Sequence, residues 1–220
     1  MLVASTIAAL PVAAQAEAAQ AEAAMSPSWF APPPSYTFEQ PSACPELARR
    51  QTLYRVCDDQ MAIFSEALAT ARSEGKLLLV TFGATWCPSC KSLHQGLETP
   101  AASDRPVASQ FVRVEIAVST LKDGRRLAVG SGEAVLQLVL GAKPQVKPRA
   151  VPFIAIVDPN NRLSTFSRHL EDVEQGPGGD FDFDRVREIL GSAEAHMRSG
   201  TTPPAEPGWL QRKLKRWFAI

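Results

Sequence analysis

Apolar residues recur at helical spacing between Asp58 and Gly75. The four that share one face are Met61, Phe64, Leu68 and Ala71. Such a face predicts an amphipathic helix, with acidic residues at its start and a glycine at its end. The run Leu77–Val80 that follows has no polar face. That is typical of a strand at the centre of a parallel or mixed sheet that helices cover on both sides.

The second half of the chain continues this alternation of strand and helix patterns. We expect a strand at 111–116, a helix at 132–140, a strand at 152–158, an antiparallel strand at 162–169 and a last helix from Asp182 to about Met197. The pair Asp123-Gly124 is a turn signal.

Two cysteines stand where the apolar strand would pass into a helix. Cys87 falls at the expected helix start, where free backbone N–H groups and the positive end of the helix dipole favour an anion. A thiolate is such an anion, so the pKa of Cys87 should fall below its reference of about 8.5. Pro88 favours the first helical position, since it has no N–H to leave unpaired. Cys87 is therefore the candidate nucleophile, and Cys90, one turn further, is the candidate resolving thiol.

Two other readings of Cys87 and Cys90 stay open at this point. A zinc site normally needs four ligands, and the remaining cysteines, Cys44 and Cys57, form no second close pair. His94 lies four residues after Cys90 and could approach the thiols, but no second histidine stands at ligand spacing. The other alternative is an inert structural disulfide, which the strand–turn–helix context disfavours.

The segment FGATWCPSCKSL resembles the active-site segment of the thioredoxin superfamily, in which an apolar strand precedes W-C-x-x-C-K. Together with the preceding IFSEALATARSEGKLLLVTF, it is similar to the secreted or periplasmic branch that includes the C-terminal domain of DsbD. The resemblance spans about Gln60–Arg198. It implies an α/β thioredoxin-like fold, in which a central mixed sheet is flanked by helices, with an N-terminal extension and a C-terminal tail. The 61 residues between Cys90 and Pro152 are more than a minimal thioredoxin needs, so the resemblance implies inserted loops around Ser119–Gly132 and Gly141–Pro148, where they could set substrate choice.

The resemblance also implies roles for residues around the cysteines. Pro152 matches the proline that is cis in the superfamily and packs beside the two cysteines, and Val151 would offer its backbone to a substrate strand. The alternative is an ordinary trans proline at a strand start. Trp86 would shield the site, and Pro88 and Ser89 would complete the substrate-binding surface.

Two departures from the superfamily leave the redox direction open. The reducing members carry Gly-Pro between the cysteines and a buried Asp in the preceding strand, whereas this chain has Pro88-Ser89 and Thr81. The strong oxidants of the DsbA type carry Pro-His, which this chain also lacks. An intermediate redox potential follows as a hypothesis.

The first residues predict export. An apolar, Ala-rich stretch within 1–16 ends in a small-x-small cleavage site at Ala14-Gln15-Ala16, although a positively charged start is missing. We therefore expect a signal peptide and a periplasmic or secreted protein; the alternative is a disordered leader in a cytosolic protein. Residues 17–57 read as a low-complexity and Pro-rich linker with an N-terminal extension, and 58–199 as the domain.

In an oxidising compartment, four cysteines favour two disulfides. The economical pairing joins Cys87 to Cys90 and Cys44 to Cys57. A disulfide that closes a loop of about 15 residues contributes roughly 3 kcal/mol to the free energy of unfolding in the chain-entropy model. The alternative is that Cys44 and Cys57 relay electrons to the first pair.

A Pro-rich linker and a basic amphipathic tail occupy 200–220. Leu210, Leu214 and Trp217 share a helical face within Trp209–Ile220, which favours contact with a membrane surface or a partner; a cap on the domain's own core is the alternative. With 23 basic and 23 acidic residues, bulk charge gives no sign of nucleic-acid binding.

The sequence thus predicts a thiol–disulfide oxidoreductase of unassigned direction, acting on protein thiols or disulfides. It would need no organic cofactor or metal, but it would need an upstream redox partner, which a membrane protein could supply. The competing hypothesis is a Cu(I)-handling or oxidase-assembly factor using the same cysteines, since thiolates favour that soft ion. A third is an interaction module whose thiols are structural.

Overall fold

A computed structural model describes residues 36–42, 44, 53–99, 107–140, 151–160, 166–170, 173–175 and 180–200. The predicted signal peptide at 1–16, most of the linker that follows it, the loop Gly141–Pro148 and the tail Trp209–Ile220 lie outside these residues. Those expectations therefore stay predictions.

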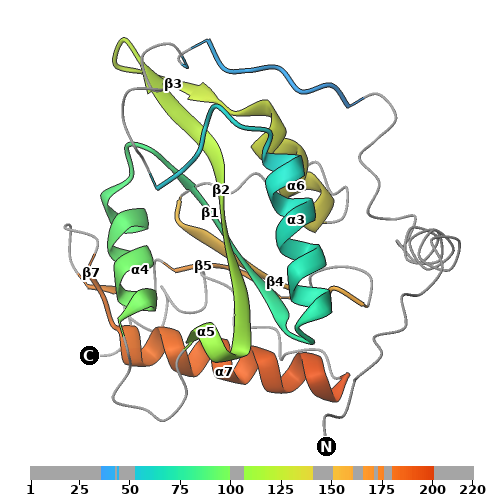
Figure 1. Cartoon of the computed structure of the whole chain (residues 1–220). Coiled ribbons are helices and arrows are strands. Elements are labelled where there is room, and N and C mark those ends of the chain that lie inside the picture. The colour runs from blue at the N-terminus through green and yellow to red at the C-terminus, as the bar shows by residue number, and fades with distance from the viewer. Residues whose placement is uncertain are drawn as a thin grey trace, which may run out of the picture. The chain divides into compact units, whose positions relative to one another are not determined.

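The described residues form strands and helices in alternation (Figure 1). The strands are β1 (Leu77–Ala84), β2 (Phe111–Lys122), β3 (Arg125–Ala128), β4 (Phe153–Val157), β5 (Phe166–His169), β6 (Glu174–Gln175) and β7 (Asp180–Phe181). The helices are α3 (Gln60–Ser73), α4 (Pro88–Glu98), α5 (Val107–Gln110), α6 (Gly130–Leu140) and α7 (Phe183–Ser199).

The main sheet is mixed, and β1 lies at its centre. Its strand order is β3-β2-β1-β4-β5, with β1 parallel to β2 and antiparallel to β4. Every residue of β1 is buried, as the unbroken apolar run predicts. The expectation of a central mixed sheet flanked by helices is confirmed.

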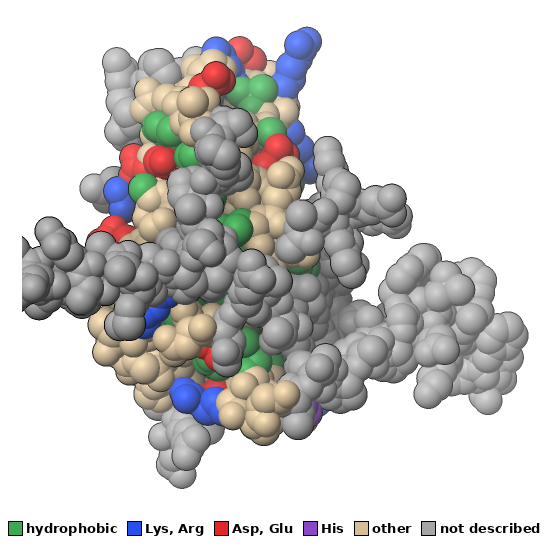
Figure 2. Space-filling view, turned by 90° about the vertical axis from the view of Figure 1, so that its right-hand side faces the viewer, with side chains coloured by type: hydrophobic (Ala, Val, Ile, Leu, Met, Phe, Trp, Pro, Cys, Tyr) green, Lys and Arg blue, Asp and Glu red, His purple; other side chains and the backbone are tan. Residues whose placement is uncertain are grey.

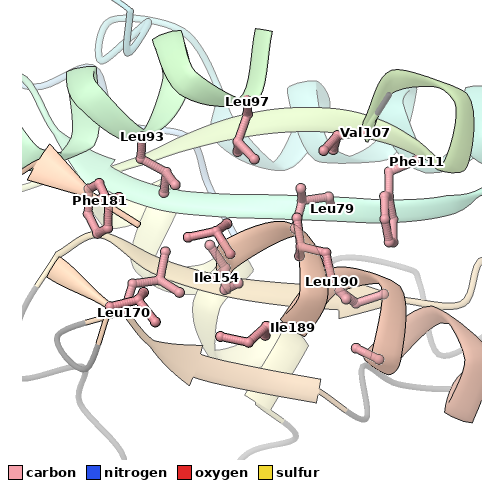
Figure 3. Close-up of a cluster of buried hydrophobic side chains, with 14 of the residues drawn as sticks. Leu79, Leu93, Leu97, Val107, Phe111, Ile154, Leu170, Phe181, Ile189 and Leu190 are labelled. Atoms are coloured by element: carbon pink, nitrogen blue, oxygen red, sulfur yellow. The ribbon is translucent and has the colours of Figure 1, made fainter. Parts of the chain in front are cut away.

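One face of the sheet carries a core shared by α4, α5 and α7 (Figure 3). Leu79 of β1 and Ile154 of β4 point into it, where they meet Leu93, Phe111 and Leu190. Burying a side chain of this size stabilises the fold by roughly 1.5–3 kcal/mol. Helices α3 and α6 pack on each other and on β2, and the buried side of α3 includes the expected Met61, Phe64, Leu68 and Ala71.

Local capping explains where the helices begin. Asp59 caps α3 by accepting from the N–H of Met61, and Asp182 caps α7 by accepting from the N–H of Arg185. Gly75 and Gly200, which follow α3 and α7, adopt the left-handed conformation with φ of 63° and 69°. These boundaries agree with the helix starts and stops read from the sequence.

The stretch Ser119–Gly132 was expected to be an inserted loop, but it is regular structure: the end of β2, β3 and the start of α6. Strand β2 runs six residues beyond the predicted end at Ile116, and β3 pairs with it antiparallel from Ser119 to Lys122. Asp123 and Gly124 form the turn with φ of 49° and 72°, a pair of positive values that a two-residue hairpin requires. The turn was predicted, but the strand extension is stabilised by β3 and left no local signal.

Candidate functional site

The two cysteines lie where β1 gives way to α4. Cys87 is the N-cap of α4, Pro88 occupies the first helical turn, and the N–H of Cys90 donates to Cys87 Sγ over 3.0 Å. The sulfur therefore occupies the place that a Ser or Asp oxygen takes in an ordinary N-cap. The turn before it is closed by the N–H of Cys87, which donates to the carbonyl oxygen of Ala84 over 3.2 Å.

Cys87 and Cys90 form a disulfide whose Cα atoms are 5.3 Å apart. Cys87 keeps 3% of its surface exposed, whereas Cys90 keeps none. An attacking thiolate would thus meet Cys87 before Cys90. The roles of Cys87 as nucleophile and Cys90 as resolving thiol stay predictions.

The predicted Val151 and Pro152 lie beside the disulfide, although they are far from it in the sequence. The peptide bond between them is cis. Cys87 Sγ is 3.7 Å from the carbonyl oxygen of Val151, and Pro152 is buried directly before β4. Of the other predicted site residues, Pro88 is exposed and Ser89 half-buried at the start of α4.

Trp86 is held in place by the end of β2 and by β3. Its indole Nε1 donates to Ser119 Oγ over 3.4 Å, and the guanidinium carbon of Arg126 lies 3.8 Å from the ring centroid. The hydroxyl oxygens of Thr85 and Thr120 are 3.2 Å apart. The contact with Arg126 was missed in the sequence, because it depends on how far β2 and β3 extend past the turn.

The Cys44–Cys57 disulfide lies near the Cys87–Cys90 disulfide. Its Cα atoms are 5.5 Å apart. Cys57 packs against a buried cluster that contains Tyr54 and Val56 together with Cys87 and Cys90. Residues just before the predicted domain start at 58 therefore contribute to the core around the redox disulfide.

Tyr54 fits into this cluster because Gly83 of β1 has no side chain. A Cβ at Gly83 would collide with the phenol of Tyr54. Burial, and secondly the charge of Glu115, raise the pKa of the Tyr54 phenol above its ordinary value. The phenol thus stays protonated beside the disulfide. Tyr54 lies inside the segment that was predicted to be an extension, so no role was predicted for it.

A polar network lies on the α4 side of β2. Glu115 Oε1 accepts from Arg113 Nη2 over 3.1 Å and lies 3.0 Å from Nδ1 of His94. The other ring nitrogen of His94 is 3.1 Å from Glu98 Oε1. In the register of β1 and β2, Glu115 is the partner of the buried Thr81. Alternate charged residues on one face of β2 were the signal in the sequence that could have found Arg113 and Glu115.

A cavity of about 250 Å³ opens between this network and the redox turn. Its lining residues are Leu53, Tyr54, Ala84, Thr85, Lys91, His94 and Gln95. The described part of the chain contains no group of three or more His, Cys, Asp or Glu side chains that could hold a metal ion. His94, which lines the cavity, contacts the carboxylates of Glu98 and Glu115.

The described helices include none that is both long enough and apolar enough to span a membrane.

Residues 59–159 match the sequence model of a family described as thioredoxin-like. No curated protein matches the chain. Among solved structures, the crystal structure of disulphide isomerase from Xylella fastidiosa Temecula1 is similar at 20% identity and a TM-score of 0.44, covering 64% of this chain and 98% of that one.

Proposed function

We propose that this protein is an extracytoplasmic thiol–disulfide oxidoreductase acting on protein cysteines, since residues 59–159 match a family described as thioredoxin-like. The observation that carries the proposal is the position of Cys87 as the N-cap of α4, with the N–H of Cys90 3.0 Å from its sulfur. A thiolate at this position accepts a backbone hydrogen bond and lies at the positive end of the helix dipole. Both interactions favour the reactive, deprotonated form of Cys87.

The reaction would proceed by two exchanges. The Cys87 thiolate attacks a substrate disulfide, one substrate thiolate leaves, and a mixed disulfide forms on Cys87. The Cys90 thiolate then attacks Cys87 Sγ, which releases the second substrate thiolate and closes the Cys87–Cys90 disulfide. The substrate gains two electrons and the protein loses two. Oxidation of a substrate dithiol is the same sequence in reverse.

Substrate would be held on the surface around Cys87. Trp86, Pro88 and Ser89 come from the redox turn, while Val151 and Pro152 approach from the segment before β4. The backbone of Val151 would pair with an extended substrate segment and bring its sulfur toward Cys87. Neither a metal nor an organic cofactor takes part in this chemistry.

An oxidising compartment fits the cysteine usage. All four cysteines are paired, and the Cys44–Cys57 disulfide would persist in the periplasm or outside the cell. A redox partner must then return the Cys87–Cys90 pair to its starting state after each turnover. Its identity and the likeness to the C-terminal domain of DsbD stay predictions, as does a membrane-surface contact through Trp209–Ile220.

The redox potential is expected to be intermediate. Thr81 replaces the buried carboxyl of the reducing members, and Ser89 replaces the histidine of the strong oxidants. The potential of Cys87–Cys90 should lie between about −270 and −120 mV, the values of thioredoxin and DsbA. Equilibration with glutathione buffers, with Cys44 and Cys57 replaced by alanine, measures it; a value outside this range contradicts the assignment.

A trapping experiment tests the activity itself. In Cys90→Ser the second exchange is blocked, so mixed disulfides with reducible protein substrates should accumulate on Cys87. Cys87→Ser, which retains the other thiol, is the matched control and should trap far less. Non-reducing gels and mass spectrometry identify the adducts.

Absence of adducts on Cys90→Ser, together with no reduction of insulin and no oxidation of reduced ribonuclease by the unaltered protein, would rule out the oxidoreductase. Stoichiometric Cu(I) binding lost on replacing either cysteine would then favour the metal carrier.

A further inference from the structure

A basic hairpin stands beside the redox site. It comprises Ser119–Ala128, the paired ends of β2 and β3 with their turn at Asp123-Gly124. Three basic side chains, Lys122, Arg125 and Arg126, lie on it with Asp123 as the only acid. The chain as a whole has equal numbers of acidic and basic residues, so this local excess is a feature of the hairpin.

The hairpin is anchored to the residues that lead into Cys87. Arg126 stacks over the ring of Trp86 at 3.8 Å, and Trp86 is followed directly by Cys87. Ser119 and Thr120 contact the side chains of Trp86 and Thr85. A substrate segment that reaches Cys87 across Trp86 would therefore pass within reach of these charges.

The charges of the hairpin are available to a partner. Arg125 and Arg126 are exposed, and within the described residues neither forms an ion pair. By contrast, Arg113, Arg187 and Arg198 each form an ion pair with a carboxylate. Lys122 donates to the carbonyl oxygen of Ser42 over 3.4 Å, which leaves its charge without a carboxylate.

A further cation lies on α4, directly after the second cysteine. Lys91 is exposed, follows Cys90 directly and lines the cavity beside the redox turn. Figure 2 shows Lys and Arg side chains projecting from the upper end of the molecule, where β3 lies in Figure 1. Some acidic side chains lie among them, so this end of the molecule is not uniformly basic. The electrostatic potential that a substrate meets therefore depends on the basic residues nearest to Trp86.

We propose that the basic hairpin binds acidic polypeptide segments that flank the reactive cysteine of a protein substrate. The inference rests on the proposed function and adds a substrate class to it. Trp86 provides an apolar platform next to Cys87 with Arg126 stacked over it, while Arg125 and Lys122, which are paired beside the turn, add positive charge at the tip of the hairpin. Charges arranged in this way raise the rate of encounter more than the final affinity, and added salt screens them.

The test uses the full chain, reduced, and three synthetic peptides. Each peptide carries one cysteine in a mixed disulfide with thionitrobenzoate, flanked by glutamates, serines or lysines. Attack by Cys87 on the peptide disulfide is followed by the release of the coloured thiol, which gives a second-order rate. At low salt the glutamate peptide should react on the order of tenfold faster than the lysine peptide. At about 1 M salt, where charges are screened beyond about 3 Å, the ratio should approach one.

Charge reversal locates the effect. Arg125→Glu should slow the glutamate peptide and speed the lysine peptide, and Arg126→Gln, which removes one charge instead of reversing it, should change both rates in the same directions by a smaller factor. Arg198→Glu, an equal reversal on α7 at the other end of Figure 1, is the control and should leave the rank order unchanged. The salt dependence of the unaltered protein tests the idea even where a hairpin variant folds poorly.

The possible results distinguish a failure of the acidic substrate class from a failure of the oxidoreductase activity. Equal rates for the three peptides at low salt, or the same response to Arg198→Glu as to Arg125→Glu, would overturn the substrate class and leave the oxidoreductase intact. No thiol release from any peptide would overturn the oxidoreductase itself.

Discussion

Single glycines mark places where segments of this domain approach too closely for a side chain. Gly83 lies against the phenol of Tyr54, and Gly132 of α6 lies against the carbonyl oxygen of Ala117 in β2. The phenol is a side chain and has some freedom to shift, whereas the carbonyl belongs to the backbone of a central strand. Gly132 therefore fixes the distance between α6 and the sheet.

Two alanine substitutions of helical glycines should have opposite effects. Gly132→Ala should destabilise the fold by about 1–3 kcal/mol, because its Cβ overlaps the backbone of β2. Gly191→Ala in α7, whose Cβ would meet nothing within 4 Å, should stabilise it by about 0.5–1 kcal/mol through helix propensity. Urea unfolding of both variants measures the difference. Similar effects of the two substitutions would mean that the α6–β2 approach is not tight.

The buried side-chain amide of Gln60 forms hydrogen bonds with several elements of the fold. Gln60, at the first position of α3, has no exposed surface. Its Nε2 donates to the carbonyl oxygens of Arg55 and Asp58 over 2.7 and 2.9 Å, and its Oε1 accepts from the N–H of Ala117 over 2.8 Å. Its own N–H donates to Ser131 Oγ of α6 over 3.3 Å. The loop that carries Cys57, strand β2 and two helices thus meet at this side chain.

Gln60→Met should destabilise the protein by about 1–3 kcal/mol. The substitution keeps the volume but leaves the buried N–H of Ala117 without its acceptor. The partly buried carbonyl oxygens of Arg55 and Asp58 lose one donor each, and that of Arg55 still accepts from the N–H of Asp58. Gln137→Met, on the exposed side of α6, is the matched control and should change stability by less than about 0.5 kcal/mol. Thermal and urea unfolding compare the two. An equally small effect of Gln60→Met would mean that water replaces the amide.

At the scale of the whole domain, a second disulfide holds the N-terminal extension against the redox site. Cys44 and Cys57 are 13 residues apart in the sequence, and residues 53–57 pack around Cys87 and Cys90. The extension is therefore part of the wall of the redox site as well as a segment leading to it. Its loss should affect stability and the surroundings of Cys87 together.

Replacing both Cys44 and Cys57 by alanine should lower the free energy of unfolding by about 2–3 kcal/mol, since a loop of this length is no longer closed in the unfolded chain. Urea unfolding is measured with Cys87–Cys90 kept oxidised in both proteins. Hydrogen exchange of the N–H groups of residues 53–57 should quicken at the same time. An unchanged unfolding curve would show that packing of Tyr54 and Val56 alone holds the extension.

The sequence by itself determined the parts of this protein that depend on neighbouring residues. Helix caps at Asp59 and Asp182, the turn at Asp123-Gly124 and the placing of Cys87 and Cys90 at a strand-to-helix turn follow from local backbone chemistry. The apolar run of β1 required a buried central strand, because no polar face was left to meet water. The thioredoxin-like fold was predictable from these local signals and the W-C-x-x-C-K resemblance.

Only the tertiary structure decided what surrounds the two cysteines. The resemblance indicated Val151 and Pro152, but their place beside Cys87 depends on the pairing of β1 with β4. The stacking of Arg126 on Trp86 depends on β3 extending β2, and Tyr54 reaches the site through the packing of the extension. Such contacts join segments far apart in the chain, and their register is set by the sheet rather than by any local pattern.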